Sequence, residues 1–469
     1  MVRRRLLVML FVVAGLCLAT PSAALAWGSG GGRAAGPGTH QWILAKANAF
    51  ARQQGTVWVD MSVAASATLE PDSDPANSTD HDYDRWGMPF GTANLRVATL
   101  YNQAVAQYRS GDRSAASRSV GLLAHYYADI CDPLHTDDSA AEHAMSGRFE
   151  SSVDWLLAGP VDASWATYDG YQRVTDPAAA TVSAATNAHA SYSALVSAYT
   201  AEGFDSRVSA IAKAGVNRAA NGVADMIMSI QQAAVEVSSS PNVSAHQGVA
   251  SGGGYYYIFY TGSITRFDQS WNATGTIDQP VGWWTGFIEP HLGDGCYYNG
   301  KLYVVAENYP AVTFQQIIVY DAVTMRYITK FWTHQPHEVS SVTVADVNDG
   351  NGPVLVVSSY FDSTQLFKYR IADGTYLGTI PLHPAPPAGI QGVAFRDGVL
   401  YLNVCPGFKI GKLYSATTDG TTKLLYVRPT LAYHEGLDYD GENLLWLVDR
   451  VTDSHVYSLK LPSFLSSLP

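Results

Sequence analysis

The chain has 469 residues, of which 15% are charged and 12% aromatic, and its formal net charge is −12. General nucleic-acid binding requires a basic surface, so this acidic, tyrosine-rich composition argues against that class of function. It does not argue against a small phosphate ester held by metal ions, and the length is enough for two or three domains.

The N-terminus has the pattern of a secretory signal. Three arginines at residues 3–5 precede an apolar run that ends in Ala-Leu-Ala at residues 24–26. This pattern predicts a signal peptide over residues 1–26 that is cleaved after Ala26, rather than a membrane span. Cleavage would leave Trp27 as the first residue of a secreted protein.

Residues 27–237 are predicted to form a helical domain. The stretches 95–111 and 114–130 carry apolar residues at helical spacing, and Gly111 ends the first of them. Alanine-rich stretches at 178–203 and 206–237 continue the pattern. The sequence SSSPNVS at 238–244 has the composition of a linker.

Residues 245–469 have a different periodicity, with short Tyr-, Val- and Leu-rich runs between Gly, Asp and Asn turns, as expected for strands. They contain an internal repeat of about 45 residues, the size of one four-stranded propeller blade. Five repeats predict an all-β propeller with five blades. They begin at His246, His291, His337, Ile390 and His434.

The sequence HYYADICDPLH at 125–135 concentrates metal-ligating residue types. On a helix, His125 and Asp129 lie one turn apart on one face and can bind one ion. Pro133 ends that helix, so the His135 side chain is expected to point in a different direction from those of His125 and Asp129 and can bind a second ion. The alternative is a buried His–Asp hydrogen-bonded pair with a separate surface histidine.

Further candidate ligands lie elsewhere in this half of the chain. The free amine and carbonyl of Trp27 can chelate a metal, and His40 follows thirteen residues later. Asp84 lies in HDYDRWG, and Glu150 lies in RFESSVD after His135.

These features together resemble the bacterial zinc-dependent phospholipase C family, which is related to the alpha-toxins and more distantly to the S1/P1 nucleases. The resemblance rests on Trp27 followed by His40, on the pattern H-x3-D-x5-H from His125 to His135, and on the stretches around Asp84 and Glu150. It covers residues 27–237 and implies an all-α zinc-dependent phospholipase C-like domain. The propeller lies outside the resemblance.

The resemblance implies up to three zinc ions in a helical cleft, with Asp129 bridging two of them. It also implies that Asp84 acts as the general base on the attacking water. The implied ligands, grouped by ion, are Trp27, His40 and Asp129; Asp84, His125 and Asp129; and His135 with Glu150.

Two positions depart from the family pattern. Asn94 stands where the second ion normally has a histidine, and Ser146 stands where the third has one. Asn94 and Ser146 could make weak metal contacts, as could His143, although His143 lies two helical turns from Glu150. The sequence therefore predicts one intact and two weakened zinc sites.

The repeated histidines at His246, His291, His337 and His434 could converge on the central channel of the propeller as a ligand site. The alternative, which we favour, is that they hydrogen-bond neighbouring blades.

The sequence thus predicts a secreted zinc phosphodiesterase that hydrolyses phospholipids, with transient contact to a membrane surface and the propeller as a recognition module. One alternative is a non-catalytic binding protein, in which the propeller binds the ligand and the helical domain is a degenerate metal scaffold. Another is an S1/P1-like nuclease or nucleotidase.

Overall fold

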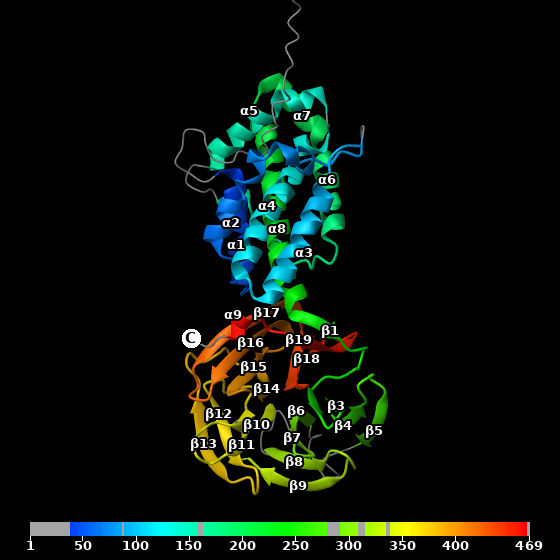
Figure 1. Ribbon diagram of the computed structural model, residues 1–469, viewed down its shortest axis with the longest axis vertical. Coiled ribbons are helices and arrows are strands. Elements are labelled where there is room, and N and C mark those ends of the chain that lie inside the picture. Colours follow the sequence, from blue (N-terminus) through cyan, green and yellow to red (C-terminus); the bar gives the residue numbers. More distant parts are fainter. Residues whose placement is uncertain are drawn as a thin grey trace, which may run out of the picture.

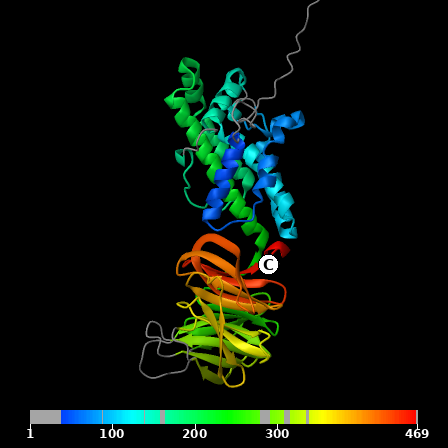
Figure 2. The ribbon, with the colours of Figure 1, turned by 90° about the vertical axis from the view of Figure 1, so that its left-hand side faces the viewer.

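The computed structural model describes residues 38–86, 89–137, 139–157, 163–278, 291–307, 315–333 and 338–466. The first part is helical and the second consists of antiparallel sheets, and the two stand end to end (Figure 1). A view turned by 90° shows the same arrangement (Figure 2). Among the described helices, none combines the length and the apolar character needed to cross a bilayer.

The helical part packs around one almost fully buried helix, α4, with Asp112 as its N-cap. Neighbouring helices cover it on all sides, and the absence of a side chain at Gly121 lets α2 approach closely, because a Cβ there would lie 2.2 Å from the Ala64 carbonyl oxygen. The helices are α1 (Thr39–Gln53), α2 (Met61–Ala67), α3 (Ala93–Ser110), α4 (Arg113–Cys131), α5 (Ala140–Leu157), α6 (Pro177–His189), α7 (Tyr192–Glu202) and α8 (Ser206–Val235), with short 3-10 turns η1 (Pro71–Ser73), η2 (Pro75–Asp80), η3 (Pro133–Thr136) and η4 (Ala163–Trp165).

The second part contains three four-stranded antiparallel sheets, each built from strands consecutive in the chain. The first comprises β2 (Gly248–Gly252), β3 (Tyr255–Tyr260), β4 (Ser263–Phe267) and β5 (Ala273–Asp278). The second comprises β6 (His291–Tyr298), β7 (Lys301–Glu307), β8 (Gln315–Asp321) and β9 (Tyr327–Trp332). The third comprises β10 (Ser341–Asp346), β11 (Pro353–Ser358), β12 (Gln365–Arg370) and β13 (Tyr376–Pro381).

A seven-stranded sheet follows, in the order β1-β19-β18-β17-β16-β15-β14. Its long strand β17 pairs with β16 through residues 422–432 and with β18 through residues 433–439, so the sheet contains two four-stranded units that share β17. Its members are β1 (Glu236–Ser239), β14 (Ile390–Arg396), β15 (Val399–Val404), β16 (Lys409–Thr417), β17 (Thr422–Tyr439), β18 (Leu444–Asp449) and β19 (Ser454–Leu459).

The five four-stranded units follow one another in space as they do in the chain. The first strand of each unit contacts the first strand of the next, from β2 through β6, β10 and β14 to β17, and β17 returns to contact β2. The order of contacts is therefore cyclic.

The connection between the two parts is structured. Ser238 and Ser239, which the sequence placed in a linker over 238–244, belong to β1 and pair with β19. The physical reason is that α8 delivers the chain directly to the edge of the sheet, where β1 satisfies the backbone groups of an otherwise unpaired edge strand.

One hydrophobic core continues across the junction and includes residues of α1, α3, α4 and α8 together with residues of β15–β19. Tyr108 of α3 packs edge-on against Phe464 of the short helix α9 (Ser463–Ser466), with ring centroids 5.0 Å apart. Beside the core, Arg428 of β17 pairs with Glu236 at a distance of 2.8 Å, and both side chains are buried. Continuous burial of this kind couples the two parts mechanically.

Candidate metal centre

Helix α4 presents His125 and Asp129 on one face, one turn apart, and both are fully buried. His125 Nδ1 lies 2.8 Å from the carbonyl oxygen of Thr68 and donates to it. That bond fixes the tautomer and leaves the Nε2 lone pair available as a ligand. Nε2 lies 3.3 Å from Asp72 Oδ1 and 3.4 Å from Asp129 Oδ2.

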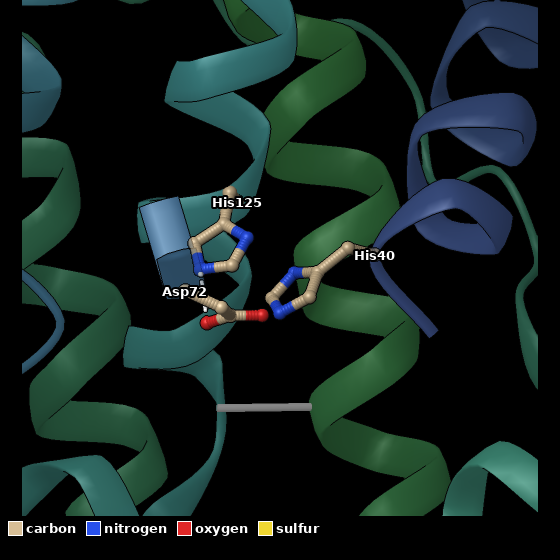
Figure 3. A group of neighbouring side chains, drawn as sticks. All are labelled: His40, Asp72 and His125. Carbon is tan, nitrogen blue, oxygen red and sulfur yellow. Dashed lines mark ion pairs between the residues drawn. The ribbon is translucent and has the colours of Figure 1, made fainter. Parts of the chain in front are cut away.

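His40 enters the same site from the first turn of α1. Its Nε2 lies 3.3 Å from Asp129 Oδ1, and its ring stacks on that of His125 with centroids 3.8 Å apart. Figure 3 shows His40, His125 and Asp72 converging from α1, α4 and η1. The start of α1 is held in place because the Thr39 N–H donates to Asp154 Oδ1 at 2.9 Å.

His81, in the irregular segment after η2, completes this cluster. Its Nδ1 lies 2.7 Å from Asp129 Oδ2 and 3.3 Å from His125 Nε2. Neither His81 nor Asp72 was among the residues predicted from the sequence. Both lie outside regular helices, where no spacing rule links them to α4. The one available signal was the His81–Asp82 pair directly before the Tyr83–Asp84 stretch.

A second cluster lies around His135 in η3. His135 Nδ1 is 2.8 Å from Asp82 Oδ1, and its Nε2 is 3.5 Å from Glu150 Oε1 on α5. Asp132, directly after α4, accepts from the Leu134 N–H at 2.9 Å and starts the turn that carries His135. His135 and Glu150 were predicted from the sequence, but Asp82 and Asp132 were not.

Among the residues that the structure describes, the side chains form three compact groups whose potential ligand atoms lie within 4.8 Å of one another. The first group is His40, Asp72 and His125; the second group is His81, His125 and Asp129; the third group is Asp132, His135 and Glu150.

The donor atoms fit metal ions. Two ligands at about 2.0–2.1 Å from a tetrahedral zinc stand roughly 3.3–3.4 Å apart, close to the His–carboxylate separations above. Within the described part of the chain, several buried atoms at the site lack a hydrogen-bond partner, which is costly unless a cation compensates them. These atoms are both carboxylate oxygens of Asp72, Asp129 Oδ1, His135 Nε2 and Glu150 Oε1.

The first and second groups share His125, whose Nε2 can bind only one ion. Asp129 has two oxygens that face different partners, Oδ1 toward His40 and Oδ2 toward His81 and His125. The arrangement therefore suits two ions. One ion would lie between His40 and Asp129. The other would be held by His81, His125 and the carboxylates of Asp72 and Asp129.

The electrostatics of the site favour a bound cation. Burial raises the pKa of Asp129 to about 7 and that of Glu150 to about 8, and it lowers the pKa of His81. Burial opposes protonation of His135, but the hydrogen bond to Asp82 and the nearby Glu150 carboxylate outweigh it and raise the His135 pKa well above its usual value. Divalent cations would neutralise the same carboxylates without protons.

The remaining residues predicted as ligands or weak metal contacts are Asp84, Asn94, His143, Ser146 and Trp27. Asp84 is bridged to Phe90 in a short antiparallel contact, accepts from the Trp86 N–H at 2.8 Å, and belongs to none of the three groups found in the described residues. Asn94 is the second residue of α3, and its Oδ1 is buried without a hydrogen-bond partner among the described residues. The His143 side chain is 61% exposed beside Glu142, and Ser146 is buried. Weak metal contacts of Asn94 and Ser146 stay a prediction. Trp27 lies outside the described residues.

The propeller histidines have unlike surroundings. His246 is half-exposed and pairs with Asp449, whereas His434 is fully buried, with its Nδ1 3.6 Å from the Cys405 sulfur and its ring against Trp446. His337 and the His291 side chain lie outside the described part of the chain. Their convergence on a channel stays a prediction.

Comparison with known proteins supports a phospholipase C-like region. No family model matches the chain. A phospholipase C of Listeria monocytogenes is 38% identical over 79 residues, which are 16% of this chain and 27% of the Listeria protein. The chain therefore matches about a quarter of the length of that relative.

Solved structures with local similarity include the alpha toxin of Clostridium absonum, at 13% identity and a TM-score of 0.31, covering 65% of this chain and 97% of the toxin. They also include the WD40 domain of Neurospora crassa Pan2, at 7% identity and a TM-score of 0.29, covering 45% of this chain and 74% of that one. These scores are too low to carry an argument about the fold. What the comparisons establish is that one segment of this helical-plus-β protein is similar in sequence to a bacterial phospholipase C.

Proposed function

We propose that this protein is a secreted, zinc-dependent phosphodiesterase of the phospholipase C type. The observation that carries the proposal is the set of three adjoining His/carboxylate groups buried in the helical part. Its members are His40, Asp72, His81, His125, Asp129, Asp132, His135 and Glu150. The segment similar to a Listeria phospholipase C points to the same reaction class.

Bound zinc would supply charge neutralisation for a phosphoryl group and a water of lowered pKa. The chain's own residues set the rest. Asp129 holds two positions at a fixed separation, and Thr68 and Asp82 orient the rings of His125 and His135.

We assign the proton-accepting carboxylate to Asp72 rather than to Asp84. Asp72 lies beside His125 Nε2, and neither of its oxygens has a hydrogen-bond partner among the described residues. Asp84 is engaged with the backbone of its own loop. One oxygen of the Asp72 carboxylate can bind the ion beside His125 Nε2 while the other accepts a proton from bound water.

The ligand set also bears on the degenerate-scaffold alternative. That alternative rested on the missing histidines at Asn94 and Ser146. His81 provides an imidazole to the second group and Asp132 provides a carboxylate to the third, so both groups have three donors. This supports a competent centre.

We further propose that residues 245–466 form a five-bladed propeller that recognises the substrate or its surroundings. Five four-stranded antiparallel units with cyclic contacts between their first strands support this. The N-terminal strand β1 would complete the last blade by pairing with β19. Ring closure would bury unit faces that cannot be buried alone.

The test is hydrolysis by the purified mature protein of a phosphocholine ester, a phosphatidylcholine vesicle and a dinucleotide. We expect hydrolysis of the first two, its loss on chelation, and its return with added zinc. Preference for the dinucleotide would instead support the nuclease alternative. A zinc-loaded protein that hydrolyses none of the three would overturn the proposal.

A further inference from the structure

The three groups differ in the kind of donor that they offer. The first and second groups are rich in imidazole, with His40, His81 and His125 among their members. The third group has one imidazole, His135, and two carboxylates, Asp132 and Glu150. This difference affects which metal each position prefers.

The third group is built to receive an ion. His135 Nε2 and Glu150 Oε1 are 3.5 Å apart, their side chains are 0% and 2% exposed, and neither atom has a hydrogen-bond partner in the described part of the molecule. Asp82 accepts from the opposite nitrogen of the His135 ring at 2.8 Å. That contact holds the ring so that the Nε2 lone pair points toward Glu150.

Asp132 is fixed beside this pair by the fold. It caps η3 through the Leu134 N–H and follows the last residue of α4, so its position is set by the same helix that carries His125 and Asp129. It is fully buried. With Asp82, three carboxylates surround a single histidine.

Carboxylate and water ligands suit Mg²⁺, Ca²⁺ and Mn²⁺, whereas imidazole suits zinc. Mg²⁺ and Ca²⁺ favour oxygen donors throughout, so the one imidazole favours Mn²⁺ among the three. Zinc binds most N/O sites more tightly than manganese does, so the discrimination between positions is relative rather than absolute.

We propose that Asp132, His135 and Glu150 form an exchangeable position that takes Mn²⁺, while the two positions that share the imidazoles of His40, His81 and His125 retain zinc. The loaded protein is then a mixed zinc–manganese centre. This inference rests on the proposed metal centre but not on its lipid substrate.

The test begins with metal-free mature protein that is reloaded with two equivalents of zinc. Mn²⁺ is then titrated in, and the electron paramagnetic resonance signal of free Mn²⁺ reports binding. We expect one Mn²⁺ per chain with both zinc ions retained, as measured by elemental analysis. Failure to take up the two zinc ions would contradict the proposed function itself, at a stage before manganese is added.

Two variants assign the Mn²⁺ to this position. Asp132→Asn keeps an oxygen that can accept from the Leu134 N–H but removes the charge, and should weaken Mn²⁺ binding by at least about tenfold. Ser146→His adds an imidazole one turn before Glu150 without touching that cap, and should let a third zinc displace Mn²⁺ at a lower zinc concentration than in the natural protein. No Mn²⁺ uptake after zinc loading, or uptake that neither variant changes, would overturn the proposal.

Discussion

Asp129 is the residue on which the centre depends most. One of its oxygens lies 3.3 Å from His40 Nε2 and the other 2.7 Å from His81 Nδ1, so it serves two positions. We predict that Asp129→Asn lowers the zinc content by up to two ions per chain. Loss even of a supporting contact costs about 10–100-fold in metal affinity. Elemental analysis after dialysis measures this, and a variant that retains all its zinc would contradict the bridging role.

Asp72 and Asp84 form a matched pair of substitutions. Asp72→Asn should reduce hydrolysis of the phosphocholine ester by about 100-fold or more, as expected when a general base is lost. Asp84→Asn should change it little, since Asp84 contacts the backbone of its own loop. The reverse ranking of kcat in the two variants would return the base to Asp84.

The predicted residues that the structure brings into the groups lie on α1, α4, η3 and α5, whereas the unpredicted Asp72 and His81 lie in η1 and in the segment after η2. His125 and Asp129 were predicted because helical spacing puts them on one face, and His40 and Glu150 because family spacing marks them. Asp72 and His81 reach the site through η1 and the segment after η2, whose path depends on tertiary packing. Asp84 lies two residues from Asp82, which supports a predicted ligand, but its carboxylate accepts from the Trp86 N–H in its own loop, a local contact that no spacing rule predicts.

At the scale of elements, α8 holds an extended segment along its side. Side chains spaced along α8 accept backbone N–H groups of residues 167–174, which have no strand partner. The pairs are Thr167 with Asn217, Asp169 with Asn221, Gln172 with Asp225 and Val174 with Ser229. The four-residue spacing of the acceptors places them on one face of the helix.

One of these acceptors makes stability depend on pH. Burial raises the pKa of Asp225 from 3.8 to about 7. The folded state therefore holds more protons than the unfolded state between these values, and stability falls as pH rises through them. We predict that Asp225→Asn, which keeps an acceptor for the Gln172 N–H, is more stable than the natural protein at pH 8 and that this advantage shrinks toward pH 4.

Thermal unfolding of both proteins across that range measures the difference. Asp225→Ala serves as the control, because it removes the same titrating group and the acceptor as well, and should therefore be about 1–3 kcal/mol less stable than Asp225→Asn at every pH. An advantage of Asp225→Asn that does not change with pH would contradict the assignment.

The periodicity of the helices and strands could be predicted from the sequence, but the strand pairing of the segment that joins the two parts could not. The helical pattern over residues 95–130 and the five repeats after His246 correspond to α3 and α4 and to five four-stranded units. The serine-rich stretch after α8 has the composition of a linker, yet Ser238 and Ser239 pair with β19. The pairing of an edge strand uses backbone N–H and C=O groups, which nearly every residue has. Amino-acid composition therefore does not show that residues 238–239 form a strand.

At the scale of the whole molecule, the two parts share one core and a buried ion pair. Glu236 accepts from Arg428 Nε at 2.8 Å and from the Tyr426 hydroxyl at 3.1 Å, with side chains of the ion pair 4% and 0% exposed. We predict that Glu236→Ala costs about 3–5 kcal/mol, because it leaves Arg428 buried and unpaired.

The unfolding transition tests this coupling. The natural protein should unfold in one step, since the core is continuous across the junction. Arg370→Ala, which breaks an ion pair whose side chains are 52% and 51% exposed, should cost no more than about 1 kcal/mol. Equal costs for the two variants, or separate transitions of the two parts in the natural protein, would refute the coupling.

Anomalous diffraction at the zinc absorption edge, from crystals of the zinc-loaded mature protein, tests most directly whether the buried His/carboxylate groups of the helical part hold catalytic zinc. We predict one peak enclosed by Asp72, His81, His125 and Asp129, and a second between His40 and Asp129. Zinc-bearing crystals with no peak at these residues, or with Asp84 as a ligand in place of Asp72, would contradict this assignment.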